Sequence, residues 1–293
     1  MILKEIDSKE ERNRILNELY GQATTQQQRY KIKKDIEALN KGYKGEKEAA
    51  YYINELLSES KAWVVIHDLR LELRGRSAQI DHILVNRIGL IWVVETKNWS
   101  SKIIINKHGE FEVESNGKKY GVESPIEQNK RHIDFLKWYM EENRIIPEKL
   151  GVKIKLEFVN MVLLPKTARI KRPLNSRFDT TNVIRVDRLA SEFDKFVESV
   201  QIYDAWKVLK IISEDKLHEL CRKLISGHTV KNRNYYNDVD KLRTKSKTNE
   251  NGYFCASCRK TISSAEAKFC WSERNKRRFN GRAYCRECQG KVK

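Results

Sequence analysis

The sequence has 293 residues, of which 40% are hydrophobic, 33% are charged and only 4 are proline. A chain of this length and composition buries a sizeable core, which excludes a disulfide-held peptide and a wholly disordered protein. The 58 Lys and Arg residues outnumber the 40 Asp and Glu residues, giving a net charge of +18. This excess favours a polyanionic partner such as nucleic acid.

Neither membrane insertion nor export is expected. The densest apolar run, residues 88–94, has seven residues, whereas a membrane-spanning helix needs about 20. The first 14 residues carry charges where a signal peptide needs an apolar core, so we expect a cytoplasmic protein. Its six cysteines should then be reduced.

The first two thirds of the chain predict an α/β domain. Residues 1–41 predict a polar, helical amino-terminal extension, and an amphipathic helix follows Gly42. Short β-branched and aromatic runs over 63–115 then predict a meander of about five strands. A helix that begins at Pro125 and another strand complete the order α, β, α, β. We expect a mixed sheet flanked by helices, in a domain spanning 42–187.

The remaining third predicts helices, a linker and a second module. Residues 188–227 contain two or three helical segments that pack on or follow the sheet domain. Residues 228–252 lack apolar periodicity and predict a flexible basic linker to a module at 253–293. Residues 229–293 hold 17 basic and 6 acidic side chains, a net charge of +11, so the basic charge is concentrated there.

Two neighbouring strands carry an acidic constellation. A turn near Gly89 makes the strand with Asp81 adjacent to the strand with Glu95 and Lys97, whose side chains share one face. Two carboxylates at one point suit Mg²⁺ or Mn²⁺, and a nearby lysine can stabilise charge on a phosphate. Such residues also occur on exposed sheet faces, but the apolar run 91–94 favours a buried, central strand.

This pattern resembles the signature of the PD-(D/E)XK nucleases, and its surroundings resemble their nuclease-related domain (NERD) family. Three segments carry the resemblance: KGYKGEKEAAYYINELL, QIDHILVNRIGLIWVVETKNW and SPIEQNKRHIDFL. The family implies a restriction-endonuclease-like fold. It maps Glu46, Asp81, Glu95, Lys97 and Gln128 onto the catalytic site and adds the carbonyl of Thr96 as a ligand for Mg²⁺ or Mn²⁺. Ile80 replaces the proline of the superfamily's name.

Three histidines lie outside this constellation. Alternation along the strand points His82 away from Asp81, which indicates a core or supporting role. His67 and His132 have no evident partner in the sequence, and we assign them no role.

Four of the six cysteines predict a closed, tetrahedral zinc site. Cys255, Cys258, Cys285 and Cys288 form two Cys-x-x-Cys pairs separated by 26 residues. Cys270 lies between the pairs, either as a small buried residue or as a replacement for one ligand. A module of about 40 residues needs such a metal because its core is small.

Basic residues between the two pairs suit a nucleic-acid backbone: Lys276, Arg277, Arg278 and Arg282. Phe279 and Tyr284 beside them could stack on bases or form the module's core. The module resembles the zinc fingers of topoisomerase-type tails, which implies DNA tethering; recruitment of a protein is the alternative use.

The combined expectation is a bacterial, metal-dependent nuclease that hydrolyses phosphodiester bonds, preferably of DNA, while the zinc finger tethers the substrate. The alternative is an adaptor that binds nucleic acid without cleaving it and recruits a helicase or another partner. A homo-oligomer is compatible with both.

Overall fold

The computed structural model describes residues 1–115, 117–149, 152–174, 178–203, 211–230 and 253–292. The chain divides into two compact units, Met1–Asn17 with Tyr30–Asn232 and Glu18–Arg29 with Arg233–Lys293. Two predicted segments lie partly outside the described residues. They are residues 204–210 of the helix predicted at 204–212, and residues 231–252 of the linker predicted at 228–252.

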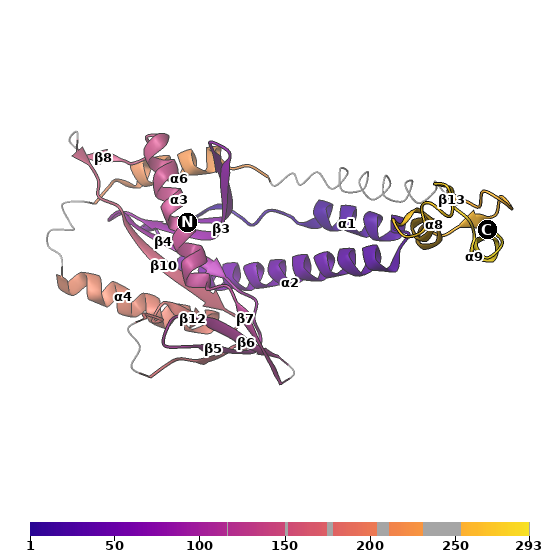
Figure 1. The fold of residues 1–293 in the computed structure, drawn as a ribbon. Helices are drawn as coiled ribbons and strands as arrows, with labels where there is room; N and C mark the ends of the chain where they lie inside the picture. The colour runs from indigo at the N-terminus through magenta and orange to yellow at the C-terminus, as the bar shows by residue number, and fades with distance from the viewer. Residues whose placement is uncertain (116, 150–151, 175–177, 204–210, 231–252, 293) are drawn as a thin grey trace. The chain divides into compact units, whose positions relative to one another are not determined.

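A mixed sheet of six strands forms the centre of the first unit, in the order β1-β2-β3-β4-β10-β12 (Figure 1). β2, β3 and β4 are antiparallel neighbours, whereas β10 lies parallel to β4. In the order of the sheet, the strands span Ile2–Lys4, Trp63–Leu73, Arg76–Asn86, Leu90–Thr96, Glu157–Leu164 and Val183–Arg185. The expected α/β class, a mixed sheet flanked by helices, is confirmed.

Helices cover both faces of this sheet because its central strands are apolar on both sides. In β2, Val64 and Ile66 belong to one core cluster, and Trp63 and Val65 to the other. The first cluster lies under α3 (Pro125–Glu142) and α6 (Glu214–Ser226). The second lies under α2 (Gln26–Leu57) and α4 (Leu189–Tyr203), which follows a short 3-10 helix at Val186–Arg188. Figure 1 shows α3 and α4 on opposite sides of the strands.

The predicted five-stranded meander is wrong in one respect, because the chain leaves the central sheet after β4. β5, β6 and β7 instead form a second sheet with β11 along the edge of β5. These strands span Lys102–Ile105, Phe111–Ser115, Lys118–Val122 and Arg169–Lys171. Ile103, Ile105 and Phe111 pack on Val162 and Leu164 of β10. Only the first three predicted strands therefore share the central sheet.

The amino-terminal segment contributes a strand that the sequence pattern did not reveal. β1 pairs in parallel with β2. With only three residues, β1 is too short to show the alternation that identifies a strand. α1 (Glu10–Gln22) follows, and α2 then runs without interruption through the expected boundary at residues 41 and 42. No helix in the described ranges is both long and apolar enough to cross a bilayer.

The described part of the cysteine-rich module, 253–292, is small and compact. It contains the hairpin of β13 (Tyr253–Phe254) and β14 (Thr261–Ile262), then α8 (Ser264–Trp271) and α9 (Arg286–Gln289). Its core combines Ile262, Ala267 and Ala283 with three of the cysteines. One further two-stranded ribbon, β8 (Glu148–Lys149) with β9 (Val152–Lys153), lies in the first unit.

Gly45 lets α2 approach the chain just beyond β4. A Cβ added there would lie 2.7 Å from Cβ of Asn98, whereas one added at Gly42 would meet only Oε1 of Glu46 at 3.9 Å. We expect Gly45→Ala to lower the free energy of unfolding by about 1–3 kcal/mol, because the added methyl group would push α2 away from Asn98. Gly42→Ala should raise it by about 0.5–1 kcal/mol, because alanine favours the helix. Urea unfolding of both variants tests this; equal effects would contradict it.

Candidate functional site

The pairing of β3 with β4 brings Asp81 and Glu95 together. His82 pairs with Val94 in this register, so Asp81 lies opposite Glu95 on the neighbouring strand. The backbone N–H of Thr96 donates a hydrogen bond of 2.8 Å to Oδ2 of Asp81. Opposite residues of an antiparallel pair project from the same face, so both carboxylates point to one place.

Lys97 connects Glu95 to the neighbouring helix. Its Nζ lies 2.6 Å from Oε1 of Glu95, which is only 3% exposed, and donates a 2.8 Å hydrogen bond to Oε1 of Gln128. The backbone N–H of Lys97 donates to the carbonyl of Leu163, which keeps this residue aligned with β10 after β4 has ended. The structure thus places Lys97 in direct contact with both Glu95 and Gln128.

Asn129 fixes α3 against the sheet and so orients its neighbour Gln128. The helix begins at Pro125 with Ser124 as its N-cap, whose side chain accepts a hydrogen bond from the N–H of Glu127. The amide of Asn129 is fully buried and donates to the carbonyl of Val93 at 2.7 Å and to Oδ1 of Asn160 at 2.8 Å.

His132 belongs to this site, although we assigned it no role from the sequence. It follows Gln128 by four residues and therefore lies on the same face of α3. Its Nδ1 is 3.3 Å from Oε2 of Glu95. The spacing of four from Gln128 was the available signal, but it becomes informative only once the helix is known to face the sheet.

Glu46 is a residue of α2 and directly follows Gly45, where the helix packs closely against Asn98. The Asn98 side chain donates a 2.6 Å hydrogen bond to the carbonyl of Lys41, which holds this part of the helix to the end of β4. Burial raises the pKa of Glu46; the nearby charges of Asp68 and Glu95 act in the same direction, and that of Lys9 opposes them. The charge of Glu46 in turn raises the pKa of Asp81, so Glu46 interacts electrostatically with both carboxylates of the pair.

The two central carboxyl groups have pKa values that shift in opposite directions. Burial, and then the charges of Glu95 and Glu46, raise the pKa of Asp81 well above its ordinary value. Burial would also raise the pKa of Glu95, but His132 and Lys97 outweigh burial and lower it. Groups separated in this way are typical of functional sites.

His82 lies on the opposite face from Asp81 and takes part in a buried chain of hydrogen bonds. Its Nε2 lies 3.1 Å from Oγ1 of Thr96, and its Nδ1 lies 2.7 Å from Nδ1 of His67. Nε2 of His67 is 2.9 Å from Oδ1 of Asn54 on α2. Both imidazoles are completely buried. They therefore link the helix that carries Glu46 to the residue that binds Asp81.

The donor set of the carboxylate site suits a hard divalent cation. Within the described part of the chain, Oε2 of Glu46 is buried without a hydrogen-bond partner, and the buried Oε2 of Glu95 faces the imidazole of His132 at 3.3 Å. Buried carboxylate oxygens of this kind are ligands that Mg²⁺ and Mn²⁺ prefer. Asp81 and Glu95 could hold such an ion with the Thr96 carbonyl, and water and substrate oxygens would complete its coordination.

An open groove of about 820 Å³ lies on another side of α2. Its basic lining residues are Lys41 and Lys44 from the helix and Lys166 after β10, joined by Asn98 and Tyr51. The ring of Tyr51 is exposed. Three lysines beside an exposed aromatic ring provide the side chains that bind a phosphate backbone and stack on bases.

The four cysteines of the two pairs converge as expected. The sulfur atoms of Cys255, Cys258, Cys285 and Cys288 all lie within 4.8 Å of one another. Those of Cys258 and Cys285 are 3.7 Å apart, and a tetrahedral zinc with bonds of about 2.3 Å places its sulfurs roughly 3.8 Å apart. Among the described residues, these four cysteines are the group in which at least three His, Cys, Asp or Glu side chains lie close enough together to hold a metal ion.

Cys270 lies outside this group and is buried. Its sulfur accepts hydrogen bonds from the N–H of Tyr284 and the amide of Gln289, both at 3.4 Å. Of the two alternatives for Cys270, a small buried residue or a replacement zinc ligand, the structure supports the buried residue.

The four basic residues predicted to bind nucleic acid, Lys276, Arg277, Arg278 and Arg282, are all exposed, but they differ in their contacts. Arg278 donates hydrogen bonds to the carbonyls of Gln289 and Val292 and so helps to fix the end of the described chain. Phe279 is 1% exposed, so it is a core residue. The exposed aromatic side chains are instead Tyr253, Phe254, Phe269 and Trp271.

Comparisons with known proteins agree with the geometry. Residues 41–163 match the family described as "Nuclease-related domain". An uncharacterised protein of Bacillus anthracis is 32% identical over 104 residues, which are 35% of this chain and 48% of that protein. The chain thus spans about half the length of this relative. No solved structure matches the chain.

The cysteine geometry predicts one zinc ion per chain. We expect Cys258→Ser or Cys285→Ser to lose the zinc, because three thiolates leave the site incomplete. Cys270→Ser should retain one equivalent, since its sulfur lies outside the group of four and accepts hydrogen bonds from Tyr284 and Gln289. Elemental analysis of the purified proteins gives the stoichiometry; zinc loss in Cys270→Ser would show that this cysteine is a ligand.

The buried imidazoles predict that stability falls in acid. Burial and the charge of Lys4 lower the pKa of His67 to about 4, so the unfolded chain binds more protons than the native one below pH 6.5. Above pH 6.5, His67 therefore does not lower the free energy of unfolding. By pH 5, it should have lowered this free energy by about 2 kcal/mol. His67→Gln should show a flatter pH profile of unfolding. The exposed His108→Gln is the control, and a profile as flat as that of His67→Gln would contradict the assignment.

Proposed function

Since residues 41–163 match the nuclease-related domain family, we propose that this protein is a metal-dependent nuclease that hydrolyses phosphodiester bonds, preferably of DNA. The observation that carries the proposal is the contact of Lys97 with both Glu95 and Gln128, beside Asp81. A buried acidic residue, a lysine and an amide on one face are chemically suited to phosphate hydrolysis.

Each side chain has a distinct role in this proposal. Asp81 and Glu95, with the carbonyl of Thr96, hold Mg²⁺ or Mn²⁺, which supplies Lewis-acid activation of the phosphate and of water. Lys97 stabilises charge on the phosphoryl oxygens. Gln128 orients Lys97 and the attacking water, and Glu46 serves as a further acidic ligand or base. His132 holds Glu95 in place through its imidazole.

Two basic surfaces support nucleic acid as the substrate. The groove with Lys41, Lys44 and Lys166 lies along α2 in the unit that carries the acidic site. The module at 253–293 contributes Lys276, Arg277 and Arg282, which are exposed. We propose that zinc stabilises this module and that the module tethers DNA, because a closed four-thiolate site has no position for catalysis.

A second candidate is an adaptor that binds nucleic acid without cleaving it and recruits a helicase or another protein. The close pairing of Lys97 with Glu95 favours this candidate, since the ammonium group occupies one of the two oxygens that a metal would use. The two functions differ in whether the metal displaces this lysine.

Cleavage assays on linear, circular and single-stranded DNA with Mg²⁺ or Mn²⁺ test the proposal. We expect Lys97→Met and Glu95→Gln to reduce cleavage at least about a hundredfold, because each removes charge from the reacting phosphate or its metal. Lys102→Met is the control, since Lys102 pairs with Glu114 in the second sheet.

EDTA should abolish the activity of the unsubstituted protein. Equal cleavage by the unsubstituted protein and Lys97→Met would contradict the assignment of the site. Binding of DNA and RNA without cleavage of either would favour the adaptor.

A further inference from the structure

One residue within β2, opposite Asp81 of the candidate site, has a left-handed backbone conformation. Asp68 has a φ of 51° although it is not glycine, and only 3% of it is exposed. Both features are unusual, because a buried carboxylate needs partners and this conformation disfavours most side chains. Residues kept in such a conformation cluster at functional sites.

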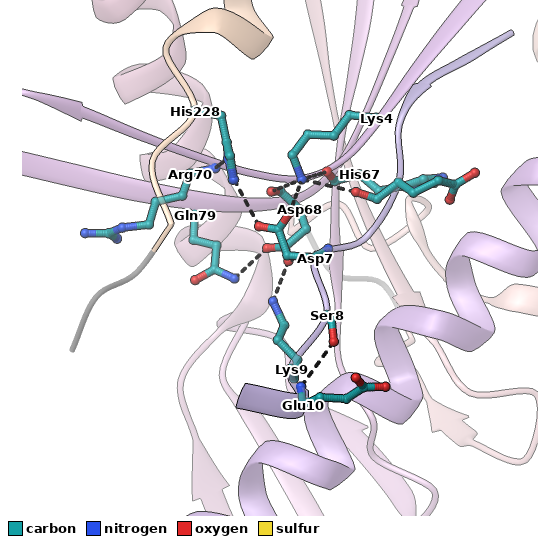
Figure 2. Close-up of polar contacts among 11 residues, drawn as sticks. Lys4, Asp7, Ser8, Lys9, Glu10, His67, Asp68, Arg70, Gln79 and His228 are labelled. Carbon is teal, nitrogen blue, oxygen red and sulfur yellow. Dashed lines mark hydrogen bonds and ion pairs between the residues drawn. The ribbon is translucent and has the colours of Figure 1, made fainter. Parts of the chain in front are cut away.

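Residues 4–9, from the end of β1 to the start of α1, supply most of the partners of Asp68 (Figure 2). The ammonium of Lys9 and the backbone N–H of Asp7 donate to Oδ2 of its carboxylate. Lys4 donates to the backbone carbonyls of His67 and Asp68, at 3.1 and 3.0 Å. Lys4 and Lys9 therefore hold, respectively, the backbone and the side chain of Asp68.

The same residues border the candidate metal ligands. His67 pairs with His82 and Leu69 with Ile80, so Asp68 stands across the hairpin from Asp81. Gln79, two residues before Asp81 on β3, donates a 2.8 Å hydrogen bond to Oδ1 of Asp68.

Glu46 also adjoins this cluster. The charges of Lys9 and Asp68 act on its carboxylate with opposite signs. Asp68 thus acts electrostatically on Glu46 and lies opposite Asp81 in the hairpin.

We propose that Asp68 and Lys9 are positioning residues of the metal site, and that residues 4–9 complete a site whose ligands lie in the family-matched domain. This inference rests on the proposed function. Lys9, Asp7 and Lys4 lie outside the matched residues 41–163. The pair fixes the backbone of β2 at the position opposite Asp81, and the ammonium of Lys9 balances the charge of the Asp68 carboxylate there.

The two members of the pair make opposite electrostatic predictions, which allows a sharp test. If only charge mattered, Asp68→Asn would weaken binding of a cation and Lys9→Met would strengthen it. If the pair positions the ligands, both substitutions weaken binding. Asparagine is a suitable replacement because it tolerates the left-handed conformation and can keep one acceptor oxygen.

The experiment measures Mn²⁺ affinity of the full chain by electron paramagnetic resonance of free Mn²⁺, together with the melting temperature. We expect Asp68→Asn and Lys9→Met each to weaken Mn²⁺ binding about tenfold or more, and Lys9→Arg to restore it to within about threefold. Lys223→Met is the control, because Lys223 forms an exposed ion pair with Glu219.

If Lys9→Met fails to fold, the double variant Lys9→Met with Asp68→Asn replaces it, because no unpaired buried charge then remains. We expect this variant to fold and to bind Mn²⁺ about tenfold more weakly. Unchanged affinity in the folded variants, or tighter binding by Lys9→Met alone, would overturn the positioning role.

Failure of the proposed function gives a different result. In that case the unsubstituted protein binds no Mn²⁺, or Glu95→Gln binds it equally well, and the metal site and its positioning residues fall together.

Discussion

The antiparallel pairing of β3 with β4 is the constraint on which the whole candidate site depends. It sets Asp81 opposite Glu95, and the N–H of Thr96 then binds the Asp81 carboxylate. A shift by one residue would move every side chain of a strand to the other face, so the buried faces of both strands enforce this register. Asn129 fixes α3 to these strands, because its side-chain amide donates hydrogen bonds to the carbonyl of Val93 on β4 and to Oδ1 of Asn160 on β10.

Patterns within one element allowed much of the fold and part of the site to be predicted from the sequence. The strand period located β2, β3 and β4, and the helical period located α3. Contacts between distant segments were not predictable in this way. The contact of His132 with Glu95 requires α3 to lie over β4, and β1 can be recognised only from its pairing with β2. The second sheet was missed because strand runs do not disclose which sheet they join.

Electrostatic cost explains why the acidic residues have so many polar neighbours. Several carboxylates in a partly buried space repel one another, and each loses hydration energy. Lys97 and His132 compensate Glu95, the Thr96 N–H compensates Asp81, and Lys9 compensates Asp68. The cations and hydrogen-bond donors come from β4, α3 and the amino-terminal segment. The charge balance of the site is therefore a property of the assembled unit and not of any one motif.

The buried pair of histidines also fixes where individual protons reside. Oδ1 of Asn54 accepts a hydrogen bond, so the network assigns the proton of His67 to Nε2 and leaves its Nδ1 as an acceptor. His82 must then carry its proton on Nδ1, and its Nε2 accepts from the hydroxyl of Thr96. The donors therefore point in one direction, from the strand that carries Glu95 to the helix that carries Glu46. Both rings must change tautomer together, so the pair behaves as one unit with a single orientation.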